Sequence, residues 1–446
     1  MGRFFPQGRR GAGKVLSGVV FSASQRLCGR TLGGRTLGVG ESGGGNTSLC
    51  KNAMPSHFII MWITRTMEAE ILGSAAKRPV VVLSGARQTG KTSLLRRCFP
   101  RHSYVSLDLP SESEQAEQDP DSFLSRHPSP VIIDEVQYAP KLFRHIKAVV
   151  DQRRKQPGQF LLTGSQQFRL MKEVSDSLAG RAALLTLEGL SETEILAAHP
   201  DASLTERLWR GGWPELWEDR SLDPVSFLNS YIATYLERDV RSFAQVGSLR
   251  DFERFLRACA LRSANLLNKA DLARDVGVAP STINQWISIV EAAGQILLLE
   301  PWFNNQGKRL IKSPKLYLAD TGLLCALLNL RSPDAIGLSA FVGAIWETYV
   351  ATQLRHRERR RVPTVRNLYF WRDGTREVDF VTESDGELSL WEAKWKEHPT
   401  VDDAVNLHHA IHALGPAHIA KASIIARPPN RYPIAPDIEA VSTREL

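Results

Sequence analysis

The sequence predicts an α/β protein in which a parallel sheet carries the first functional site and a smaller sheet follows near the end of the chain. Three observations lead to this prediction. An apolar, β-branched run at 80–83 enters a glycine-containing loop at 85–92, and a helical pattern follows the loop. A second apolar run ends in two adjacent carboxylates within 130–135. Two strand-like segments separated by an Asp-Gly turn occupy 376–391.

The composition is that of a globular protein with more than one domain. A chain of 446 residues exceeds one ordinary hydrophobic core, so two to three domains are expected. Hydrophobic residues make up 43% of the chain and charged residues 23%. The five cysteines are scattered without a C-x-x-C pair, which argues against disulfides or a zinc site and favours a reducing compartment. No apolar run approaches the ~18 residues of a membrane span, so no membrane partner is expected.

The glycine-containing loop matches G-x-x-x-x-G-K-[ST], the phosphate-binding loop of P-loop NTPases. Its glycines permit unusual backbone angles, and the helix that follows presents free N–H groups to an anion. We expect Lys91 to reach the β- and γ-phosphates of ATP and the Thr92 hydroxyl to bind Mg²⁺. The expected cofactor-binding residues are Gly85, Ala86, Arg87, Gln88, Thr89, Gly90, Lys91, Thr92 and Ser93.

The second apolar run is a Walker B strand. Asp134 is expected to hold the magnesium and Glu135 to act as general base toward the attacking water. A single strand between the loop and this one is typical of the additional-strand ATPases, which include the AAA class. Thr163 or Ser165, at the end of the next strand, is expected to contact the γ-phosphate or the water. Arg181 either senses the phosphate or pairs with a structural carboxylate.

A helix-turn-helix pattern occupies 271–284 and is followed by strand-like segments that would form a wing. Winged helices read DNA with their second helix. That helix lacks Arg and Lys between Ala279 and Gly294, which is a poor match to a polyanion. A structural module and a DNA reader therefore remain alternatives.

Four residues of the last third form a second constellation: Glu347 in an apolar helical segment, Asp379 in a strand, and Glu392 with Lys394 after a hairpin turn. This is the layout of the PD-(D/E)xK nuclease core, in which carboxylates bind magnesium and the lysine steadies the attacking water or the phosphate. Glu392 and Lys394 would project to one side because strand side chains alternate. The alternatives are a buried ion pair and a fold retained without catalysis.

With these motifs in this order, residues 65 to 446 resemble the prokaryotic AAA-type ATPases that carry a C-terminal domain of unknown function with a restriction-endonuclease-like core. The resemblance implies nucleotide binding and a bacterial or archaeal cytoplasm. The Gly-, Ser- and Arg-rich composition of 1–62 predicts a disordered extension, from which the family pattern differs. The order of the motifs predicts an ATPase domain at 63–200, a helical linker or lid at 201–265, a winged helix at 266–325 and a nuclease-like domain at 326–446. For 1–62, a start assigned too far upstream is preferred to a transit peptide.

The first functional hypothesis is a Mg²⁺-dependent ATPase whose nucleotide state governs a nuclease-like domain acting on DNA. The second is a nucleotide-dependent switch whose silent C-terminal domain binds a protein partner or a further copy of the chain. The third is a winged-helix regulator that binds DNA. The cofactors expected for the protein are ATP and Mg²⁺.

Overall fold

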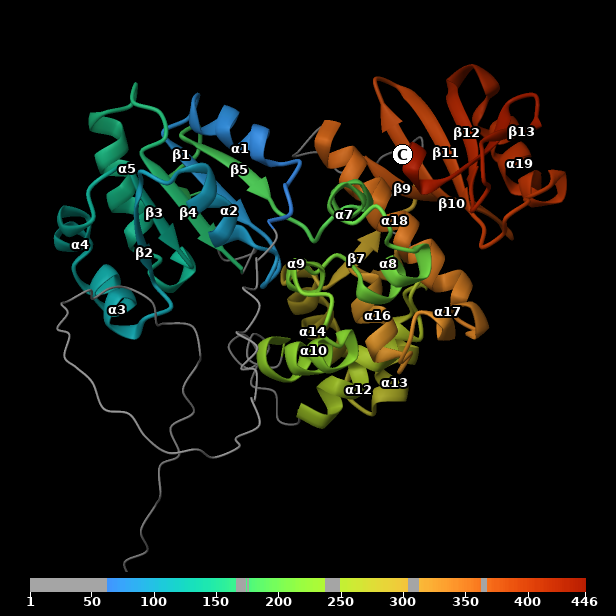
Figure 1. Cartoon of the computed structure of the whole chain (residues 1–446), viewed down its shortest axis with the longest axis horizontal. Coiled ribbons are helices and arrows are strands. Elements are labelled where there is room, and N and C mark those ends of the chain that lie inside the picture. Colours follow the sequence, from blue (N-terminus) through green and yellow to red (C-terminus); the bar gives the residue numbers. More distant parts are fainter. Residues whose placement is uncertain (1–61, 166–173, 175, 237–248, 304–312, 362–366) are drawn as a thin grey trace, which may run out of the picture. The chain divides into compact units, whose positions relative to one another are not determined.

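Five parallel strands form the sheet that carries the glycine-containing loop (Figure 1), in the order β2-β3-β4-β1-β5. Their bounds are β1 Val80–Ser84, β2 Ser103–Ser106, β3 Val131–Asp134, β4 Phe160–Gly164 and β5 Ala182–Thr186. Strand β4 lies between the loop strand β1 and the Walker B strand β3, and pairs with both in parallel. This is the additional-strand arrangement, so the predicted fold class of the first domain is confirmed.

Helices cover both faces of this sheet because successive side chains of its strands point to opposite sides. Val80 and Val82 pack with Phe143 on one face, whereas Val81 and Leu83 pack on the other. The covering helices are α1 Glu68–Ala75 and α2 Lys91–Cys98 on the second face, and α3 Pro110–Gln118, α4 Pro120–Arg126 and α5 Leu142–Gln152 on the first. A strand buried on both faces requires a continuous apolar run, which β1 has.

The computed structural model describes residues 62–165, 174, 176–236, 249–303, 313–361 and 367–446. The predicted disordered extension lies outside these residues except for Trp62, whose indole N–H donates to Glu68 at 3.3 Å. Among the residues described, no helix is both long and apolar enough to cross a membrane.

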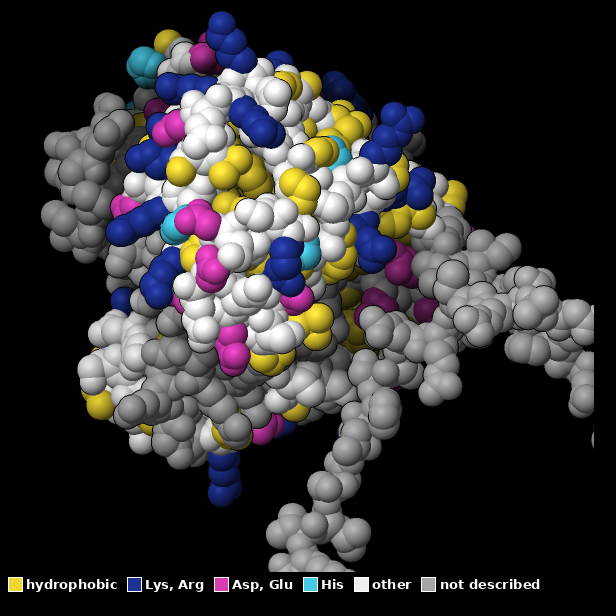
Figure 2. All heavy atoms as spheres, turned by 90° about the vertical axis from the view of Figure 1, so that its left-hand side faces the viewer, with side chains coloured by type: hydrophobic (Ala, Val, Ile, Leu, Met, Phe, Trp, Pro, Cys, Tyr) yellow, Lys and Arg dark blue, Asp and Glu magenta, His cyan; other side chains and the backbone are white. Residues whose placement is uncertain are grey.

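Charges of both signs lie on the helices that cover the five-stranded sheet. On the face seen in Figure 2, Lys and Arg side chains stand among Asp, Glu and apolar side chains. Ion pairs such as Arg126–Glu112 and Lys141–Glu117 join α3 to its neighbours there. Exposed pairs of this kind contribute little stability.

A helical region follows the sheet and ends in one long helix. Its helices are α7 Glu192–Ala198, α8 Leu204–Arg210, α9 Pro214–Glu218, α10 Pro224–Tyr231, a π-helix at Ile232–Leu236, α12 Leu249–Ala260, α13 Lys269–Val276, α14 Pro280–Ala292, α16 Thr321–Leu327, α17 Asp334–Leu338 and α18 Val342–Arg361. A three-stranded antiparallel sheet, ordered β6-β8-β7, lies among them, with β6 Asn265–Leu266, β7 Ile296–Leu299 and β8 Lys315–Leu318.

The expected helix-turn-helix is formed by α13 and α14. Gly277 ends α13 with a φ of 81°, a left-handed conformation that favours glycine, and Pro280 opens α14. Ile283 and Trp286 are buried on the inner face of α14. The two segments expected to form the wing, 295–302 and 310–318, contain β7 and β8, which pair antiparallel. Residues 304–312 between these strands lie outside the described part, so the winged-helix assignment stays a prediction.

The C-terminal part is a six-stranded mixed sheet ordered β13-β14-β12-β11-β10-β9. Its strands are β9 Leu368–Asp373, β10 Arg376–Ser384, β11 Glu387–Ala393, β12 Ile419–Ile425, β13 Tyr432–Ala435 and β14 Ile438–Val441. Helix α18 packs on the face that holds Phe380 and Trp391, and α19, Val405–Leu414, packs on the face that holds Val381. The α18 face belongs to the same hydrophobic core as the helical region.

A buried ion pair connects the first two helices of the helical region. Arg207 on α8 donates to Glu192 on α7 at 2.9 Å, and each side chain is at most 4% exposed. The backbone N–H of Glu192 also donates to Gln353 of α18 at 2.9 Å. Two buried charges of opposite sign therefore compensate each other where α7, α8 and α18 meet.

We expect Arg207→Leu to lower the free energy of unfolding by roughly 3–5 kcal/mol, because it leaves the Glu192 carboxylate buried without its cation. Urea unfolding followed by tryptophan fluorescence measures the change. The matched control is Arg274→Leu, which breaks the exposed pair with Asp271 and should cost less than about 1 kcal/mol. An equal decrease in the free energy of unfolding of the two variants would contradict the proposed compensation of Glu192 by Arg207.

Candidate functional site

The loop between β1 and α2 has the backbone that close contact with an anion requires. Gly85 has a φ of 149°, and a Cβ built there would lie 2.1 Å from the carbonyl oxygen of Leu187, so only glycine fits. Gly90 has a φ of 87° and directly precedes α2. The first N–H groups of α2 lack partners within the helix and point toward the loop. This cradle fits phosphate oxygens.

The Lys91 side chain folds back into the loop. It is buried, and its ammonium donates to the carbonyl oxygens of Gly85 at 3.1 Å and Ala86 at 2.7 Å. The positive charge is thus held within the loop that would receive the phosphates.

Asp134, at the end of β3, is surrounded by hydroxyl groups. Thr92 donates to its Oδ1 at 2.7 Å, Tyr104 donates to its Oδ2 at 3.2 Å, and Thr163 also donates to Oδ1. Burial and the charge of Asp134 raise the pKa of Tyr104 to about 12, so the phenol stays a donor. Carboxylate and hydroxyl oxygens are the ligands that Mg²⁺ prefers, so Thr92 and Asp134 fit this ion. Sequence reasoning missed Tyr104.

Glu135 has a left-handed backbone, with a φ of 53°, and its side chain is buried. Its carboxylate accepts from Gln137 and, at 3.1 Å, from Ser165, and its N–H donates to Thr163 at 3.1 Å. Burial would raise the pKa of Glu135, but the charge of Lys91 and the Gln137 hydrogen bond bring it below the usual value. Glu135 is therefore a carboxylate at neutral pH, the form that a general base needs.

Arg181 does not join this group. It precedes β5, and its carbonyl accepts from the N–H of Val80 at the start of β1, whereas the phosphate loop follows the other end of that strand. The guanidinium instead pairs with both carboxylate oxygens of Asp151, at 2.6 and 2.9 Å. Of the two predicted roles, the geometry favours the structural ion pair.

The four nuclease-like residues converge on one end of β10 and β11. Lys394 donates to Glu392 at 2.8 Å, and the N–H of Ala393 donates to Asp379 at 2.9 Å. Glu347 of α18 faces the same cluster. The four predicted residues therefore lie together in the structure.

Lys315 of β8 lies in the middle of this cluster, and sequence reasoning missed it. Its ammonium lies 2.6 Å from Glu377, 2.9 Å from Glu347 and 3.3 Å from Asp379. Burial and repulsion by Asp379 raise the pKa of Glu347 to about 7. The same two causes raise the pKa of Glu392 to about 8.

Comparison with known families identifies the domains. Residues 77–196 match the family described as AAA domain, and 201–334 and 342–446 match two domains of unknown function, DUF8612 and DUF4143. The chain is 32% identical over 389 residues to the uncharacterized proteins Rv2008c of Mycobacterium tuberculosis and Mb2031c of Mycobacterium bovis. The alignment covers 86% of this chain and 84% of each relative. The chain therefore belongs to the same family as these two mycobacterial proteins. It carries an AAA-type, nucleotide-binding ATPase domain.

Solved structures that are similar to this AAA-type protein include a Walker-type ATPase and an ORC2 protein. A Walker-type ATPase of Pyrococcus abyssi is 16% identical, with 60% of this chain and 96% of that chain covered and a TM-score of 0.42. The ORC2 protein of Aeropyrum pernix in its ADP form is 13% identical, with 61% and 92% covered and a TM-score of 0.29.

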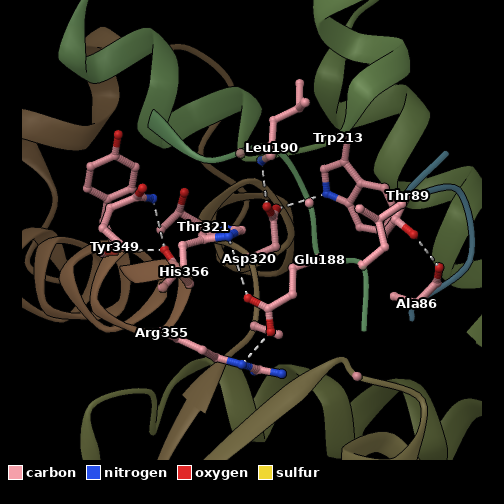
Figure 3. A pocket seen from close by; sticks show the side chains of 18 of the residues that line it. Ala86, Thr89, Glu188, Leu190, Trp213, Asp320, Thr321, Tyr349, Arg355 and His356 are labelled. Carbon is pink, nitrogen blue, oxygen red and sulfur yellow. Dashed lines mark hydrogen bonds and ion pairs between the residues drawn. The ribbon is translucent and has the colours of Figure 1, made fainter. Parts of the chain in front are cut away.

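A pocket beside the phosphate loop is lined by the AAA domain, by the helical region after it and by α18 (Figure 3). Ala86 and Thr89 of the loop line it together with Trp213, Tyr349 and Arg355. Aromatic, apolar and polar side chains are therefore combined next to the phosphate cradle, a composition typical of ligand pockets.

Glu188 connects the loop after β5 to α18 at this pocket. Its carboxylate lies 2.5 Å from Arg355 and 2.8 Å from Arg359. Arg65 links the phosphate loop to the segment that holds Glu188, because its guanidinium donates to the carbonyl oxygens of Thr89 at 2.9 Å and Glu188 at 2.7 Å. No motif marks these residues, which is why sequence reasoning missed them.

We expect Glu188→Gln to lower stability at pH 7 by on the order of 3 kcal/mol. Burial would raise the pKa of Glu188, but Arg355 and Arg359 lower it to about 2. A lowered carboxyl pKa stabilises the fold above the ordinary value near 4.5, and this contribution is lost as the pH falls from there toward 2. The difference between variant and parent should therefore shrink below pH 4.5 in urea unfolding.

The control for this prediction is Glu439→Gln, which breaks an exposed pair with Arg431. It should change stability by less than about 1 kcal/mol at any pH. A Glu188→Gln protein as stable as its parent at pH 7 would show that the arginines do not depend on this carboxylate.

Proposed function

We propose that the protein is a Mg²⁺-dependent ATPase that works as a nucleotide-controlled switch, with α18 as the element that responds. The observation that carries the proposal is the pocket that Ala86 and Thr89 of the phosphate loop share with Tyr349 and Arg355 of α18. A nucleotide bound at the loop would extend toward residues of that helix. The proposed location of this activity is the cytoplasm.

The residues at the loop support the hydrolytic step. Thr92 and Asp134 would hold Mg²⁺, which when bound neutralises charge on the phosphates. Lys91 would exchange its contacts with Gly85 and Ala86 for phosphate oxygens. Glu135 would take the proton of the attacking water, and Thr163, which contacts Asp134 and the N–H of Glu135, would hold the two carboxylates in register.

Helix α18 supports the coupling. Arg355 and Arg359 pair with Glu188 near one end of the helix, and Glu347 contacts Lys315 nearer the other end. A displacement of the Glu188 loop by nucleotide would act on two arginines at once. Because a helix is stiff over a few turns, the displacement would be passed toward the C-terminal sheet.

The other two hypotheses have less support. A nuclease acting on DNA would need Asp379 and Glu392 to be available to a metal ion, whereas a lysine ammonium lies among the carboxylates. For a DNA-binding regulator, α14 would have to bind the phosphate backbone without Lys or Arg. We therefore propose a protein partner, or a second copy of this chain, as the target of the switch.

Glu135→Gln is expected to reduce ATP hydrolysis by about a hundredfold or more while ATP binding is kept, because the proton acceptor is lost and the phosphate cradle is not. Lys91→Ala should weaken ATP binding at least about tenfold. Phosphate release and fluorescent-nucleotide titration measure the two effects. Lys141→Ala, on the exposed surface, is the control. Undiminished ATP binding by Lys91→Ala would refute the assignment of the loop.

Binding of ATP and Mg²⁺ to the Glu135→Gln protein is expected to slow amide hydrogen exchange in 342–361. The added change Arg355→Ala with Arg359→Ala should remove this response without abolishing ATP binding, because the helix loses its contacts with Glu188. Arg360→Ala, an exposed position on the same helix, should leave the response intact. If the rate of amide hydrogen exchange in α18 is the same with and without ATP and Mg²⁺ in all of these proteins, the proposed coupling is contradicted.

A further inference from the structure

The Lys315 ammonium lies among three carboxylates of the C-terminal cluster, and two of them, Glu347 and Asp379, belong to the nuclease-like set. Its side chain is only 3% exposed. The nitrogen lies within 3.3 Å of oxygens from Glu347, Glu377 and Asp379. These carboxylates come from α18 and β10, while the lysine comes from β8 of the preceding region.

An ammonium and a divalent cation cannot share this position. Mg²⁺ requires oxygen ligands at about 2.1 Å in octahedral geometry, and a neighbouring positive charge a few ångströms away would oppose it strongly in a buried site. An ammonium has three donors, and here they face three carboxylates. The acceptors that a metal ion would need are thus already bound to a cation.

Other carboxylate oxygens of the cluster also have protein donors as partners. Lys394 pairs with Glu392 at 2.8 Å, and one oxygen of Asp379 accepts from the N–H of Ala393 at 2.9 Å. Within the part of the chain that the structure describes, no group of three or more His, Cys, Asp or Glu side chains has an arrangement that could hold a metal ion. The donor set therefore does not fit the Mg²⁺ that the nuclease-like layout implies.

We infer that Lys315 is a built-in cation that replaces the metal ion of the nuclease-like cluster, so that the C-terminal domain binds no catalytic metal. The carboxylates serve to anchor β8 against α18 and β10. This inference does not rest on the ATPase, because neither Lys315 nor its partners contact the phosphate loop in any described interaction.

The test is Mn²⁺ binding, followed by electron paramagnetic resonance of the free ion, to the full chain carrying Asp134→Asn, which removes the metal ligand of the phosphate loop. This protein should bind no Mn²⁺ at the cluster. Adding Lys315→Ala should create one Mn²⁺ site per chain, because the ammonium that opposes the metal ion is gone, and adding Asp379→Asn should remove that site again. The exposed Lys269→Ala is the matched control and should create no site.

Two results would overturn the inference. One is Mn²⁺ bound by the Asp134→Asn protein with Lys315 intact and lost on adding Asp379→Asn. The other is Mg²⁺-dependent cleavage of duplex or single-stranded DNA by the unmodified chain that Asp379→Asn abolishes. If Lys315→Ala does not fold, Lys315→Met with Glu347→Gln keeps the apolar stem and removes one charge of each sign. The measurements on proteins that retain Lys315 decide the question in either case.

Discussion

The pairing of Glu188 with two arginines of α18 is the interaction on which the arrangement of the two functional regions depends. A buried carboxylate requires a compensating positive charge, and here that charge comes from residues more than 150 positions along the chain. The backbone carbonyl of the same glutamate accepts from Arg65, which also contacts the phosphate loop at Thr89. One residue therefore joins the nucleotide cradle, the segment before α1 and the helix that leads to the last sheet.

Helix α18 forms ion pairs near both of its ends, and the helix supplies the opposite sign of charge in the two places. Toward its end the helix contributes cations to a carboxylate, whereas Glu347 contributes a carboxylate to the ammonium of Lys315. Apolar residues between them, including Val350 and Leu354, are fully buried. Ionic contacts of this kind fix the register of a helix, because sliding by one turn would leave charges buried without partners.

Local patterns predicted the parts whose chemistry depends on neighbours in sequence. The run before Gly85, the Asp134–Glu135 pair and the hairpin between β10 and β11 form as expected, because strand periodicity and turn residues act within a few positions. The convergence of Glu347 and Asp379 was also predictable, since a known core layout brings them together. Lys315 was not, because it lies in a strand of another region, and its role appears only when that strand packs beside α18.

The roles of single polar residues that belong to no motif could not be predicted from the sequence. Glu188 follows a strand as many surface glutamates do, and Tyr104 reads as an ordinary strand tyrosine until β2 is paired beside β3. Arg181 shows the reverse case: its place after a glycine allowed two roles, and only the position of β5 relative to β1 discriminates between them.

The position of Lys315 also bears on where the chain can be divided. A fragment that starts at Val342, where the match to DUF4143 begins, would contain Glu347, Glu377 and Asp379 but not the ammonium that neutralises them. Such a fragment would expose or strain an acidic cluster and lose part of the core it shares with the helical region. The unit that folds as one piece in this half of the protein therefore begins before β8, and the family boundary marks homology and not structural independence.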